Sequence, residues 1–172
     1  MFTHNQEELY KKIAKVCRVS IPILYILIVL LGVALFFIPL DILSEENTKI
    51  ILNNIEIDLT KMSTGSKYIL IIGIAATIGL AIRMLWLVIN IFNRFKHKEI
   101  FSEGNARLAN KAAVHLLLIV VSQLALNFYL SVLTGDLKLD IIEKLATVAF
   151  AYLSAWILNI GYQLKTENDL TV

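Results

Sequence analysis

The residue most open to a chemical role is an arginine inside a long apolar run. Arg83 is the only charged residue in 68–93, and none of the apolar runs contains a carboxylate that could pair with it. An unpaired guanidinium in hydrocarbon costs on the order of several kcal/mol. One interpretation is that Arg83 snorkels to the lipid phosphates of the nearer interface. The other is that it faces the neighbouring helices, is held by Asn159 or by backbone carbonyls, and receives an anion.

A second polar group lies in the apolar run 112–134. Gln123, Asn127 and Ser131 are spaced at i, i+4 and i+8, which aligns them along one face of a helix. Because unpaired amides are costly in lipid, this face should point toward other helices, where hydrogen bonding or a path for a polar solute would use it. The candidate intramembrane polar site comprises Arg83, His115, Gln123, Asn127 and Asn159.

Patterns typical of catalysis are missing from the sequence. It contains no Gly-rich phosphate loop, no HExxH and no GxSxG. His115 has no second histidine, cysteine or carboxylate at metal-ligand spacing, and the single Cys17 cannot form an internal disulfide. We therefore expect no enzyme activity, no cofactor and no metal.

The elements that carry these residues are four apolar runs, at 19–40, 68–93, 112–134 and 145–164. The whole chain is 58% apolar and only 17% charged. Each run is long enough to cross the ~30 Å hydrocarbon core as a helix and is apolar on all sides, which water would not permit. The sequence thus predicts an all-α membrane protein in which residues 1–172 form one domain, a four-transmembrane-helix bundle.

Basic residues predict how this bundle is oriented. Ten lysines and arginines lie in the N-terminal segment, the 94–111 connection and the C-terminal tail, against five in the other two loops. By the positive-inside rule, both termini and the 94–111 connection are expected in the cytoplasm.

The first outer loop, 41–67, has a pattern typical of a β-hairpin. Ile55, Ile57 and Leu59 alternate with Glu56 and Asp58, a period of two. Residues 49–52 supply a partner strand, and the two asparagines at 53–54 suit a turn.

The 94–111 connection, RFKHKEIFSEGNARLANK, is the most distinctive segment. Ser102 is a good N-cap and Glu103 places negative charge in the first helical turn, so 96–101 should be a tight turn between two antiparallel spans. Phe101 is open to a structural role, packing back on the helix, or to a role in docking. The candidate cytoplasmic docking residues are Phe95, Lys96, Lys98, Phe101 and Arg107.

The run Glu99-Ile100-Phe101-Ser102, with Asn105 and a leucine (Leu108) one place early, resembles the YoaS-like family of small four-span bacterial membrane proteins of unknown function. The resemblance implies a multi-pass protein of the bacterial plasma membrane. Members are often encoded beside a small helix-turn-helix regulator, which implies a sensing or regulatory role and a cytoplasmic protein partner.

Function is therefore first interpreted as a non-enzymatic membrane module that binds a partner or senses the envelope. A small transporter or channel subunit, acting as a homo-oligomer, is the alternative, and a membrane immunity protein falls between them. The expected partners are the lipid bilayer and a cytoplasmic protein, without direct binding of nucleic acid.

Overall fold

The computed structural model of the protein describes residues 4–44, 49–52, 55–135 and 141–170. Within them the chain forms four long helices and one β-hairpin. In chain order the elements are α1 (His4–Leu43), β1 (Lys49–Leu52), β2 (Ile55–Asp58), the 3-10 helix η1 (Leu59–Lys61), α2 (Thr64–Lys96), α3 (Glu103–Thr134) and α4 (Ile141–Leu170). Each of the four α-helices is long and apolar enough to cross a membrane, which confirms the predicted spans.

Serine and glycine residues set several of the helix boundaries. The Ser63 hydroxyl accepts a hydrogen bond from the backbone N–H of Ser66 at 3.1 Å and so caps the start of α2. Gly135, with φ of 80°, ends α3 in the left-handed region, and its N–H donates to the carbonyl of Ser131. Hence these ends satisfy part of the backbone that a helix leaves unpaired.

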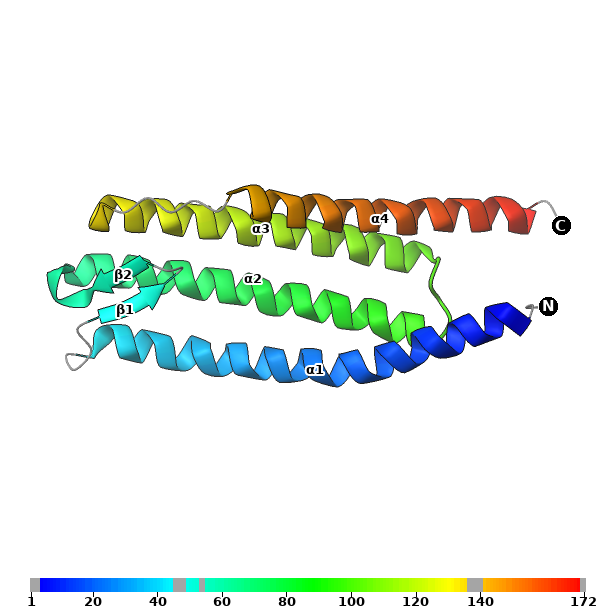
Figure 1. The fold of residues 1–172 in the computed structure, drawn as a ribbon, viewed down its shortest axis with the longest axis horizontal. Coiled ribbons are helices and arrows are strands. Elements are labelled where there is room, and N and C mark those ends of the chain that lie inside the picture. The colour runs from blue at the N-terminus through cyan, green and yellow to red at the C-terminus, as the bar shows by residue number, and fades with distance from the viewer. Residues whose placement is uncertain (1–3, 45–48, 53–54, 136–140, 171–172) are drawn as a thin grey trace.

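The helices extend well beyond the predicted spans. α1 begins at His4, whereas its apolar run begins at residue 19, because the preceding residues are good helix formers without proline or glycine. At ~1.5 Å per residue α2 is about 50 Å long, more than the ~30 Å hydrocarbon core. α1 also bends in its N-terminal half (Figure 1), where Pro22 lacks the N–H that would donate to Arg18.

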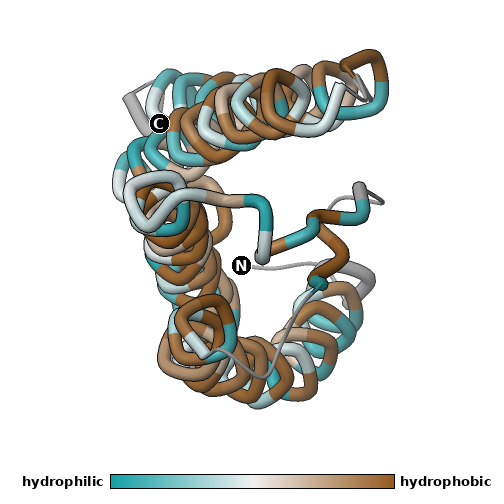
Figure 2. The backbone as a smooth tube through the Cα atoms, turned by 90° about the vertical axis from the view of Figure 1, so that its left-hand side faces the viewer, coloured by the Kyte–Doolittle hydropathy of each residue, from teal (hydrophilic) through white to brown (hydrophobic). Residues whose placement is uncertain are grey.

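The four helices pack in chain order as a curved layer. α1 packs against α2, α2 against α3, and α3 against α4. Seen along the helices, they form an arc with α1 and α4 at its two ends (Figure 2). The hairpin lies on the concave side of this arc, near one end of the helices. Both chain termini lie at the opposite end (Figure 1).

The hairpin packs on the concave side through one of its faces. β1 and β2 form the predicted antiparallel hairpin, with Ile50 opposite Ile57 and Ile51 opposite Glu56. The turn residues 53–54 lie outside the described part. Ile57 and the following Leu59 are buried, whereas Ile51 is 77% exposed on the other face. The helical side of this core comprises Ile42 of α1, Leu70 and Ile74 of α2, and Leu126 and Leu130 of α3.

This packing predicts unequal effects for two isoleucines of one hairpin. Ile57→Ala should lower the free energy of unfolding in detergent by about 2–5 kcal/mol, because it leaves a cavity among α1, α2 and α3. Ile51→Ala, the matched control, removes the same atoms from an exposed position and should have little effect. Thermal unfolding of the two purified variants would measure the difference, and equal losses would contradict the packing described here.

Candidate functional site

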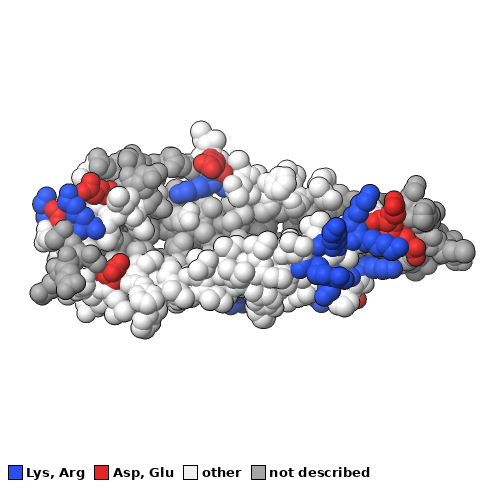
Figure 3. Space-filling model, turned by 60° about the horizontal axis from the view of Figure 1, so that its bottom comes forward, with Lys and Arg blue, Asp and Glu red and all other residues white. Residues whose placement is uncertain are grey.

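Basic residues gather at the end of the molecule that holds both termini. Figure 3 shows lysine and arginine side chains clustered there, with acidic side chains beside them. The turn between α2 and α3 lies at this same end (Figure 1), which we call the basic end. The charge asymmetry read from the sequence is thus a property of one end of the folded molecule.

The connection at the basic end is a short turn held by backbone hydrogen bonds. The N–H groups of His97 and Glu99 both donate to the carbonyl of Arg94 at 3.0 Å, and that of Lys98 donates to the carbonyl of Phe95 at 3.0 Å. Lys98 has φ of 67°, the left-handed conformation in which a helix commonly ends. The predicted tight turn is therefore confirmed, with α2 ending at Lys96 and α3 beginning at Glu103.

Asn105 holds this turn against the first turn of α3. Its side chain is buried, and its amide nitrogen donates to the carbonyls of Glu99 and Ile100. Its backbone N–H donates to the Ser102 hydroxyl at 3.3 Å, which confirms the predicted N-cap. The other side-chain atom, Oδ1, is buried without a hydrogen-bond partner among the described residues. Ser102 and Asn105 therefore have a structural role in shaping the turn.

Two glycines let side chains of the turn region pack closely on helices. The ring of Phe101 lies directly on Gly161 of α4, where a Cβ atom would overlap it. The guanidinium of Arg94 lies on Gly104 in the same way and forms an ion pair with Glu99 at 3.7 Å. The contact with Gly161 supports the structural alternative for Phe101. The ring packs on α4, however, and not on α2 or α3, the helices that its turn connects.

Four of the five predicted docking residues are exposed, and the fifth, Phe95, is half-buried. Lys96 and Lys98 are exposed, and Arg107 is exposed with its guanidinium paired to Glu103. Phe95 is half-buried, stacks on Phe92, and packs against Ile91, Ala109 and Ala155. Phe95 is thus part of the packing among α2, α3 and α4, whereas Lys96, Lys98, Phe101 and Arg107 are the exposed members of the set.

The structure does not bring the predicted intramembrane polar residues together. Arg83 is exposed and follows Ile74 by nine residues, so at ~100° per residue it points to the opposite side of α2 from this core residue. Gln123 precedes Leu130 by seven residues and therefore lies on the core side of α3. Arg83 and Gln123 face opposite sides of the helical layer, an arrangement that favours snorkelling of Arg83 over an anion site.

The remaining members of that set have separate surroundings. Asn127 is buried. The Nδ1 atom of His115 lies 2.7 Å from the carbonyl of Lys111, a local contact one turn away. Asn159 borders an open groove of about 580 Å³ on α3 and α4, together with Asn110 and Trp156. A polar contact that the sequence analysis missed joins Thr77 of α2 to Ser122 of α3 at 2.8 Å.

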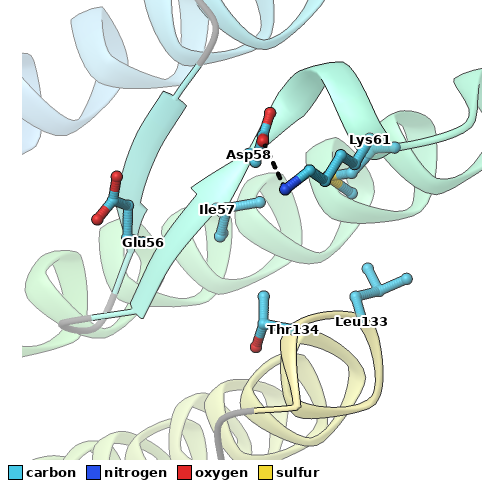
Figure 4. A pocket seen from close by; sticks show the side chains of 7 residues that line it. Glu56, Ile57, Asp58, Lys61, Leu133 and Thr134 are labelled. Atoms are coloured by element: carbon cyan, nitrogen blue, oxygen red, sulfur yellow. Dashed lines mark ion pairs between the residues drawn. The ribbon is translucent and has the colours of Figure 1, made fainter.

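A small cavity at the hairpin end also lay outside the sequence predictions. It measures about 240 Å³ and lies between the hairpin and the end of α3 (Figure 4). Its lining residues are Glu56, Ile57, Asp58, Lys61, Met62, Leu133 and Thr134. The acidic residues that alternate with apolar residues in 55–59 were the available sequence signal for this cavity.

The charges around this cavity are paired with one another. Hydrogen bonds from Thr60, and then the nearby Lys61 at 3.2 Å, lower the pKa of Asp58, so its stabilising contribution is lost as the pH falls through that lowered value. The hydrogen bond with Glu56 raises the pKa of Lys49, whose contribution is lost only at alkaline pH. Because these pairs are exposed, each contributes little to stability. In these two ion pairs the opposite charges cancel, so they leave no net charge at the cavity that could bind a ligand.

The hydrogen bonds of Asn105 predict that a substitution at this position destabilises the turn. Asn105→Asp replaces the donor to two carbonyls by an acceptor, so it should lower the free energy of unfolding by about 1–3 kcal/mol. It should also speed tryptic cleavage at Lys96 and Lys98. Asn110→Asp makes the same chemical change at an exposed position of α3 and should do neither. Unchanged cleavage of the Asn105 variant would show that the turn is held by other contacts.

Comparison with known proteins gives a family and no relative of known activity. No curated protein and no solved structure matches the chain. All of residues 1–172 match the family described as "Protein of unknown function (DUF2975)". The chain therefore belongs to the DUF2975 family, whose function is not known.

Proposed function

We propose that this protein is a non-enzymatic module of the bacterial plasma membrane that binds a cytoplasmic protein at its basic end and responds to events at its hairpin end. One observation carries the proposal: α2 and α3 hold the hairpin at one end and the exposed turn at the other. The hairpin core includes Leu70 and Leu130, and the turn is fixed to α3 through Asn105. A displacement of the hairpin would thus act on the same two helices that shape the turn.

The basic end has properties suited to binding an acidic protein surface. Lys96 and Lys98 are exposed beside each other on a turn of defined conformation. Complementary charges raise the rate and specificity of association more than its affinity. The resemblance of residues 99–105 to the YoaS-like proteins supports the same proposal and points to a small helix-turn-helix regulator as the class of partner.

The proposal requires that the basic end face the cytoplasm and the hairpin end face outward. In a Cys17→Ser background, a cysteine at Thr60 should react with a membrane-impermeant maleimide on intact cells, because the hairpin end is expected outside. A cysteine at Lys98 should react only after the membrane is permeabilised. Labelling of the Lys98 position on intact cells would reverse the orientation and remove the cytoplasmic partner from the proposal.

Partner binding is tested by two variants that lose the same charge at the same end. Lys96→Gln with Lys98→Gln should strongly reduce the yield of a co-purified cytoplasmic protein from native membranes, measured by quantitative mass spectrometry. Lys11→Gln with Lys12→Gln, on the exposed N-terminal part of α1, is the control and should retain that yield. Membrane insertion should be normal in both. Equal yields from the two double variants would exclude the turn as the docking surface.

A further inference from the structure

The inner surface of the arc holds an apolar groove near the basic end. It measures about 230 Å³ and lies between α2, α3 and α4. Its walls include Phe95 of α2, Ala109 and Ala112 of α3, and Ala151, Ala155 and Leu158 of α4. At the other end of the molecule the hairpin covers the same side of the layer. The groove therefore lies on the side of the layer that the hairpin covers at the other end.

The position of the groove matches one leaflet of a bilayer. Its lining on α2 runs from Met84 to Phe95, which at ~1.5 Å per residue is about 16 Å, or half of the ~30 Å hydrocarbon core. Phe95 lies one residue before the end of α2 at the basic end. The groove thus has the depth that the acyl chain of a lipid occupies in the leaflet at that end.

The size of the groove distinguishes an acyl chain from a helix. A helix ~10 Å across and ~16 Å long occupies on the order of 1,200 Å³. The groove offers about 230 Å³, because alanines on α3 and α4 let the helices come close and leave only a narrow space. An extended hydrocarbon chain fits such a space, whereas a helix of a second copy would have to lie outside it.

Lysine side chains supply positive charge at the end of the groove where the headgroup of that lipid would lie. Ala151, Leu158 and Lys165 follow one another at intervals of seven residues, so exposed Lys165 continues the groove-lining face of α4. On the opposite wall, exposed Lys98 donates its backbone N–H to the carbonyl of Phe95.

Two side chains of the turn near these lysines have contacts of their own. The ring of Phe101 lies on Gly161, which is between Leu158 and Lys165 along α4. The nearby carboxylate of Glu99 is paired with Arg94.

We propose that the groove binds one anionic glycerophospholipid, with an acyl chain along the alanines of α3 and α4 and its phosphate between Lys98 and Lys165. Basic pockets between helices bind such headgroups, and each nearby lysine strengthens the attraction to an anionic lipid. This lipid site shares Lys98 with the proposed protein-docking turn, whereas Lys165 and the alanines of the groove belong to the lipid site alone.

Native mass spectrometry of the full-length protein, titrated with phosphatidylglycerol or with phosphatidylcholine of the same acyl chains, tests the site. The wild-type protein should bind one phosphatidylglycerol in preference to phosphatidylcholine. Lys98→Gln and Lys165→Gln should each weaken binding of phosphatidylglycerol about fivefold and leave phosphatidylcholine unchanged. The Lys11→Gln, Lys12→Gln double variant should bind as the wild type does, since those lysines lie on α1.

Filling the groove tests the acyl-chain part separately. Ala112→Leu and Ala151→Leu place larger side chains in half-buried positions of the walls and should weaken binding of both lipids. Ala76→Leu, at an exposed position of α2, is the matched control and should change neither. If the leucine variants bind phosphatidylglycerol as the wild type does, or if the α1 lysine variant loses as much, the lipid is held by general attraction and the proposal is wrong. A wild-type dimer that the leucine variants convert to monomers would assign the groove to a second copy and would also overturn it.

Discussion

The fold depends on one constraint of the hydrocarbon layer, which is that it contains no water to pair with the backbone. Within the four spans every peptide group must bond inside its own helix, and Pro22 and Pro39 are the residues of α1 that cannot donate such a bond. In the part of the chain that the structure describes, the hairpin and the 97–102 turn both lie at an end of the molecule and carry their own hydrogen bonds. At the turn, the buried side chain of Asn105 donates hydrogen bonds to two backbone carbonyls.

Small residues decide how these helices come together. Between helices in lipid the association comes from close packing and hydrogen bonds and not from the exclusion of water. Gly104 and Gly161 admit the side chains of Arg94 and Phe101, and the alanines of α3 and α4 bring those helices close along the basic half. Near the hairpin the packing uses larger residues, Ile57 and Leu59 among them, from outside the helices. The two halves of one curved layer are therefore built differently, with a covered half and an alanine-lined half.

The sequence predicted those parts of the fold that follow from local pattern. Apolar runs identified the spans, a period of two identified the hairpin, and Ser102 marked the start of α3. Contacts between helices have no such local signal: nothing in the spacing of residues indicates that Phe101 meets Gly161, or that Phe95 points inward beside Ala109. Arg83 and Gln123 looked like members of one site because both are polar at membrane depth. The angle of each residue around its helix separates them, and that angle has meaning only once the neighbours of the helix are known.

Phe95 belongs both to the groove and to the last turn of α2, so the proposed lipid site and the proposed docking surface are in contact. Phe95 lines the groove, stacks on Phe92, and accepts through its carbonyl the hydrogen bond that fixes Lys98. A hydrocarbon chain lying against Phe95 would therefore restrict the residue from which the turn begins, while the turn presents Lys96 to the aqueous side. Because packed cores change between discrete arrangements and do not deform continuously, filling the groove would favour one conformation of the turn. If both proposals hold, lipid composition and a displacement of the hairpin would act on the same surface, because both would bear on the last turn of α2.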